Sequence, residues 1–157
     1  MLSEILGMLG IAITELKELF NGEKERRRLF INVMKEIKRN RRIISEFRGT
    51  ISPEGIVSLL DYENLFIAEK IGLNYNKYFD GTIHTSHIAT DDKIVGRWHG
   101  KEASYAFERV YELLLSLIKF SRLSRSDMNS IRTDVRLVNL GKRLSLLIEY
   151  HKDCGRL

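Results

Sequence analysis

Apolar residues recur at intervals of three and four along most of the chain, which is the period of an amphipathic α-helix. The pattern predicts an N-terminal amphipathic helix within residues 1–21 and a second helix over about 23–48. A third helix is predicted over about 53–71, because Ser52 can cap its amino end and Pro53 suits the first helical position. Each of these helices has one apolar side that needs a partner surface.

The helical period is lost over residues 72–100, where glycine, asparagine and aspartate accumulate. This stretch predicts a long glycine-rich loop, in which the short β-prone runs 82–84 and 94–95 could pair as a small hairpin. Helical spacing returns over about 101–123 and 127–153. We therefore predict an all-α fold, an antiparallel helical bundle of four to five helices with one long loop between the third and fourth helices.

The composition agrees with a single domain over residues 1–157, with 43% apolar and 30% charged residues. The chain has one proline, which favours long uninterrupted helices. Its one cysteine, Cys154, cannot form an internal disulfide, and we expect a protein of the reducing cytoplasm. The apolar run 5–13 lacks the basic leader of a secretory signal and is too short to cross a bilayer, so no membrane span is expected.

Asn40 interrupts the apolar seam of the helix predicted over 23–48. A buried asparagine at such a position can fix the register or the oligomeric state of packed helices. The alternative is that the seam bends away and leaves Asn40 in water, which is the usual situation of a short polar side chain. We expect an exposed Asn40.

Positive charge is concentrated in two segments. Residues 22–48 hold ten basic and four acidic residues, and residues 119–143 hold seven basic and two acidic residues, whereas the whole chain carries only +5. Such faces can neutralise the phosphates of nucleic acid, and a solvated basic surface is the alternative. No stacking surface for single strands is visible, because Phe30 and Phe47 lie on the apolar seam. The candidate polyanion-binding residues are Lys24, Arg28, Lys35, Arg39 and Arg42 in the first segment and Arg132, Arg136 and Arg143 in the second.

Three histidines lie in the predicted glycine-rich loop. His84 and His87 have the spacing that presents two imidazoles to one ion, and His99 with Asp91 could complete a tetrahedral zinc site. Such a site could activate water for hydrolysis. Loop residues without a metal are the alternative, because the chain has neither an H-E-x-x-H motif nor paired cysteines. The only tryptophan, Trp98, is expected to anchor the loop on the helices.

The apolar N-terminal helix and the shortage of catalytic motifs favour a non-enzymatic association module without a cofactor, which binds a second copy of itself or another protein. Nucleic-acid binding through the two basic faces is the first alternative. A metal-dependent hydrolase that uses His84, His87 and His99 is the second. A ribonuclease arrangement is not expected, because Arg143 precedes His151 by eight residues, more than two helical turns.

Overall fold

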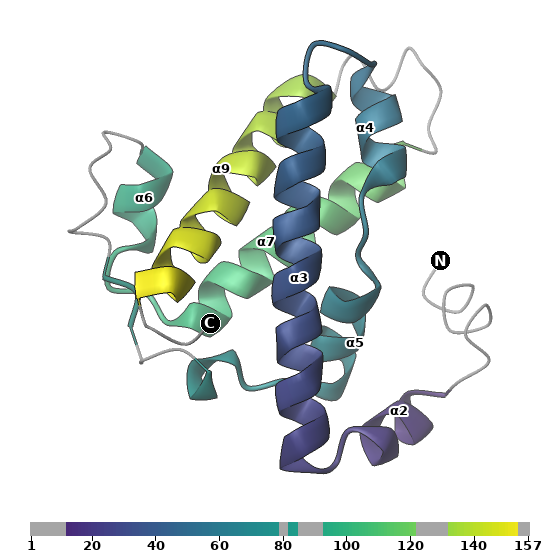
Figure 1. Ribbon diagram of the computed structural model, residues 1–157, viewed down its shortest axis with the longest axis vertical. Coiled ribbons are helices and arrows are strands. Elements are labelled where there is room, and N and C mark those ends of the chain that lie inside the picture. Colours follow the sequence, from purple (N-terminus) through teal and green to yellow (C-terminus); the bar gives the residue numbers. More distant parts are fainter. Residues whose placement is uncertain (1–11, 79–81, 85–92, 122–131, 154–157) are drawn as a thin grey trace.

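The structure, a computed structural model, describes residues 12–78, 82–84, 93–121 and 132–153 and confirms the all-α class (Figure 1). These residues form seven α-helices and one short 3-10 helix, with no strand among them. None of the helices in this part of the chain is both long enough and apolar enough to cross a membrane. The elements are α2 (Ile13–Leu19), α3 (Glu23–Phe47), α4 (Pro53–Leu59), α5 (Glu63–Ile71), η1 (Tyr75–Lys77), α6 (Lys93–Trp98), α7 (Ala103–Phe120) and α9 (Thr133–Asp153).

Three long helices make up the centre of the molecule. In Figure 1, α3 passes in front of α7 and α9, and α9 packs against both of them. Gly141 of α9 allows the close approach to α3, because a Cβ atom there would lie 3.3 Å from Cγ2 of Ile44. The short helices surround these three, so the described residues do not confirm a bundle of four to five antiparallel helices.

The helix predicted over 53–71 is divided in two. Its start is as expected, since the Ser52 hydroxyl accepts a hydrogen bond from the amide of Gly55 at 3.1 Å. However, α4 ends at Leu59 and α5 begins only at Glu63. Of the N-terminal helix predicted within 1–21, α2 is the described part, and residues 127–131 of the last predicted helix also lie outside the described residues.

The segment predicted as a loop contains two helical elements, η1 and α6. The hairpin prediction is wrong, because residues 94–95 belong to α6. Ile83 instead bonds to the chain just before α7: its amide donates to Lys101 O at 2.7 Å, and its carbonyl accepts from the Gly100 amide at 2.8 Å. Trp98 is buried at the end of α6, which confirms the expectation that it anchors this segment.

Asn40 is buried, contrary to the sequence expectation, with 2% of its surface exposed. Its side-chain amide donates to Asp61 O at 2.6 Å, and its side-chain carbonyl accepts from the Asp61 amide at 2.8 Å. Both polar groups of one linker residue are thereby satisfied, so the asparagine can be buried without an unpaired polar atom. This pair of bonds holds the linker between α4 and α5 against α3.

Glu36, one turn before Asn40, caps the amino end of α5. Its carboxylate accepts from the amides of Asn64 and Leu65 at 2.8 and 3.0 Å, and from the Asn64 side chain at 3.0 Å. These amides are among the first-turn donors that a helix leaves without an internal partner. Burial raises the pKa of the Glu36 carboxyl, while the hydrogen bonds from Asn64 and Leu65 act in the opposite direction.

Candidate functional site

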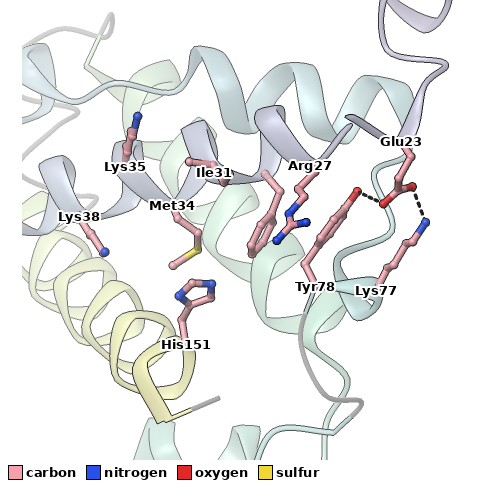
Figure 2. Close-up of a pocket in the computed structure, with 10 residues that line it drawn as sticks. Glu23, Arg27, Ile31, Met34, Lys35, Lys38, Lys77, Tyr78 and His151 are labelled. Atoms are coloured by element: carbon pink, nitrogen blue, oxygen red, sulfur yellow. Dashed lines mark hydrogen bonds and ion pairs between the residues drawn. The ribbon is translucent and has the colours of Figure 1, made fainter. Parts of the chain in front are cut away.

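A pocket of about 740 Å³ opens along one flank of α3 (Figure 2). Three separate parts of the chain line it: the amino-terminal two thirds of α3, the end of η1 with the residue after it, and the carboxy-terminal end of α9. The lining residues are Glu23, Arg27, Phe30, Ile31, Met34, Lys35, Lys38, Lys77, Tyr78 and His151.

Three rings form an aromatic row in this pocket. Phe30 stacks on Tyr78, with ring centroids 4.7 Å apart and an interplanar angle of 11°, and its centroid lies 5.7 Å from that of His151. Phe30 and His151 are buried, whereas Tyr78 is half-buried. Met34, one turn after Phe30 on α3, lies beside His151 (Figure 2). The floor of the pocket is therefore formed mainly by aromatic rings and the Met34 side chain.

Contacts with α7 fix the position of Tyr78. The ring of Tyr75 in η1 stacks on Phe107 of α7 at 4.1 Å. The side chain of Asn76 accepts from the Ser104 amide at 3.1 Å and donates to Glu102 at 3.0 Å. Because Tyr75 and Asn76 are both held by these contacts, the next residues are placed beside α3.

Four cations surround the aromatic row, of which three come from α3. Arg27 and Lys38 lie about 16 Å apart along the helix axis, and Lys35 lies next to Lys38 on the helix surface. No ion pair joins Arg27, Lys35 or Lys38 to a carboxylate in the described ranges. Their charges are thus available to a ligand.

Lys77, the fourth cation, is in a different situation. It pairs with Glu23, whose carboxylate also accepts a long hydrogen bond from the Tyr78 hydroxyl at 3.5 Å. The hydrogen bond from Lys77 lowers the pKa of Glu23. Since Glu23 is the one carboxylate lining the pocket, the lining side chains keep a net positive charge.

The candidate cations of the first basic segment divide into two groups. Lys35 lines the pocket, and Lys24 and Arg28 are exposed on the outer side of α3. Arg39 pairs with Asp61 at 2.5 Å, and Arg42 approaches Glu46 at 3.9 Å. Two of the five candidates thus already have a carboxylate partner.

The candidates of the second segment do not reach the pocket. Arg132 is exposed just before α9. Arg136 contacts α7, where Nη1 donates to Ser116 Oγ at 3.4 Å and the guanidinium lies 5.1 Å from the Phe120 ring centroid. The side chain of Arg143 also contacts α7.

Nη1 of Arg143 donates to Arg109 O at 3.1 Å. Its pKa is lowered, mainly by burial and further by the charge of Arg109. The structure therefore does not join the two basic faces at this site.

The structure brings His84 and His99 together. Their ring centroids lie 5.8 Å apart at an interplanar angle of 70°, because the bonds of Ile83 place the two histidines on adjacent chain segments. The other two candidate zinc ligands, His87 and Asp91, lie outside the described residues. Within the described ranges, no three His, Cys, Asp or Glu residues are grouped so as to hold a metal, and the zinc site stays a prediction.

Of the ten residues that line the pocket, only Lys35 was a candidate site residue from the sequence. Arg27 and Lys38 were not among the candidates, and Lys77 and Tyr78 belong to a segment expected to be a loop. His151 was considered only together with Arg143. One signal was present: an adjacent Lys77 and Tyr78 combine a cation with a stacking ring.

No protein-family model, curated protein or solved structure gives a significant match to the chain.

Proposed function

We propose that the protein binds a polyanion, and specifically nucleic acid, along α3 and the pocket beside it. The observation that carries the proposal is that Arg27, Lys35 and Lys38 line one pocket and have no carboxylate partner in the described residues. Binding of a phosphate backbone needs cations that are accessible and not already neutralised.

The rest of α3 supports an extended ligand. The helix has 25 residues, which makes it about 37 Å long. Lys24 and Arg28 add exposed cations to its outer side. A helix of this length and charge can follow several phosphates, and the release of condensed counterions then supplies much of the affinity. The competing explanation is a solvated basic surface with no ligand.

Two matched double variants test the proposal. Lys35→Ala/Lys38→Ala removes two pocket cations, and Arg39→Ala/Arg42→Ala removes the same charge from cations that already have acidic neighbours. Affinity for labelled oligonucleotides is measured by fluorescence anisotropy at rising salt. We expect the first variant to lose about tenfold in affinity and the second to lose clearly less, since phosphate contacts contribute individually.

Two results would contradict nucleic-acid binding through this site. One is the absence of any complex with the wild-type protein at low salt. The other is an equal loss of affinity in the two double variants, which would show that only the net charge of α3 matters.

Association through α2 is a second candidate function. Leu16 of this helix is buried, whereas Ile13 and Leu19 are 39% and 58% exposed. Exposed apolar side chains on one short helix suit contact with a second copy of the chain or another protein. Ile13→Asp/Leu19→Asp should lower the mass measured by sedimentation, while Leu59→Asp, at another exposed leucine on α4, should not. A wild-type protein that stays monomeric at all concentrations contradicts self-association.

A further inference from the structure

We infer that the nucleic acid is bound as a single strand, with an unpaired base in the pocket against Tyr78, the half-buried ring of the aromatic row, which stacks on Phe30. The inference rests on the proposed nucleic-acid binding and adds the form of the ligand. The observation that supports it is that cations and aromatic rings line the same pocket.

The shape of the site excludes a duplex from the aromatic row. Phe30 and His151 are buried, so Tyr78, which is half-buried, is the ring of the row that a group entering the pocket contacts. A duplex keeps its bases stacked inside and presents phosphates and groove edges to a protein surface. It can contact the cations of α3, but its base faces cannot stack on Tyr78. An unpaired base can leave the backbone and enter a recess of this kind.

The size of the pocket suits such an insertion. Its volume of about 740 Å³ lies within the range of pockets that hold small organic ligands. Between Arg27 and Lys38 the lining side chains of α3 include Ile31 and Met34, which are apolar. A planar base that enters the pocket therefore contacts apolar and aromatic groups. Neither Ile31 nor Met34 carries a charge that the base would have to desolvate.

The charges around the pocket suit the backbone of the same strand. Lys35 and Lys38 stand one turn apart, and Arg27 lies two to three turns toward the amino end of α3. Phosphates on either side of the inserted nucleotide can therefore contact cations at both ends of the pocket. This arrangement of a cationic track beside stacking rings is characteristic of proteins that bind single strands with little sequence preference.

Three ligands and the full chain test this inference by fluorescence anisotropy. They are a labelled single strand, a duplex of the same sequence, and an abasic strand of the same length, which keeps every phosphate and lacks the bases. We expect the single strand to bind about tenfold tighter than the abasic strand, because stacking of one base on an aromatic ring is lost. We also expect it to bind tighter than the duplex.

Variants of Tyr78 test whether the base stacks on this ring. Tyr78→Leu should lose about tenfold in affinity for the single strand and change little for the abasic strand. Tyr78→Phe keeps the ring and should bind as the wild type does. Tyr105→Leu is the matched control, since Tyr105 is an exposed ring of α7 with Lys101 and Arg109 nearby but does not line the pocket.

The possible results separate the inference from the proposed function. Equal affinity for the three ligands overturns base insertion and leaves polyanion binding intact. Failure of all three to bind at low salt overturns both. Because the comparison of single and abasic strands uses the wild-type protein, it decides the matter even if Tyr78→Leu does not fold.

Discussion

The two sides of α3 use polar residues in opposite ways. On the side that faces α5, Glu36 and Asn40 are buried, and together they make five hydrogen bonds with residues 61–65. On the flank that lines the pocket, Arg27, Lys35 and Lys38 form no ion pair with any carboxylate of the described ranges. One helix therefore joins a structural surface and the surface that we propose for binding. Whether a polar side chain has a partner within the fold distinguishes the two roles.

This difference predicts separable effects of substitution. Changes on the buried side should lower the free energy of unfolding and leave the intrinsic affinity of the folded protein unchanged. Changes on the pocket side should lower affinity and leave the free energy of unfolding unchanged.

Asn40→Ala should cause the largest loss of stability. It leaves the amide and carbonyl of Asp61 without their side-chain partners, and we expect the free energy of unfolding to fall by about 2–3 kcal/mol. Urea denaturation followed by circular dichroism measures this. Asn74→Ala is the control at an exposed asparagine and should change stability by less than about 0.5 kcal/mol. Equal effects of the two substitutions would show that the Asp61 bonds contribute little.

Removal of a pocket cation should change the salt dependence of binding. For single strands, each lost phosphate contact lowers the slope of log affinity against log salt by about 0.7. We expect this reduction for Arg27→Ala, Lys35→Ala and Lys38→Ala, with unfolding midpoints within error of the wild type. An unchanged slope in all three variants would place the phosphate contacts elsewhere on the protein.

Glu36→Gln should destabilise the protein by about 1 kcal/mol, because one of the two acceptor oxygens in the cap is replaced by a donor. The effect depends on pH. The pKa of Glu36 is higher in the folded than in the unfolded chain, so its contribution to stability is complete below the unfolded pKa and decreases as pH rises through the folded pKa.

The gap in stability between wild type and Glu36→Gln should therefore be larger in acid than at neutral pH. Urea denaturation of both proteins at the two pH values measures the gap. A gap that widens as pH rises would mean that the hydrogen bonds from Asn64 and Leu65 outweigh burial in setting the pKa of Glu36.

Arg39→Ala should have the smallest effect. The Arg39–Asp61 ion pair joins side chains that are 58% and 41% exposed, and pairs of this kind contribute less than about 1 kcal/mol. The unfolding midpoint should barely shift, and less so at high salt. A loss as large as that of Asn40→Ala would show that the ion pair, rather than the asparagine, holds the linker between α4 and α5.

Local sequence patterns were sufficient for the long helices. The prediction over 23–48 agrees closely with α3 (Glu23–Phe47), and that over 101–123 contains α7 (Ala103–Phe120), because many turns of one apolar stripe define a helix. The break between α4 and α5 contains no glycine or proline. It is stabilised by tertiary hydrogen bonds from Glu36 and Asn40, which are 21 to 29 residues away in sequence and leave no local signal.

The pocket could be predicted only in part for a similar reason. The high positive charge of α3 was evident, and Lys35, one of the candidate polyanion-binding residues, lines the pocket. The aromatic row combines Phe30 with Tyr78, which follows η1, and His151 of α9, and these rings are brought together by the contacts of η1 with α7 and of α9 with α3. The periodicity within one segment carries no information about contacts between rings of different segments.

The burial of Trp98 has a practical consequence. It is the only tryptophan in the chain and is 3% exposed, at the end of a helix that packs on α9. Selective excitation of the protein therefore yields emission from one indole in one apolar environment. A red shift of that emission reports the release of the segment around α6 from the helices, and it can be followed in the same sample as the anisotropy of a labelled strand. The molecule thus contains its own optical probe of folding, separate from the pocket.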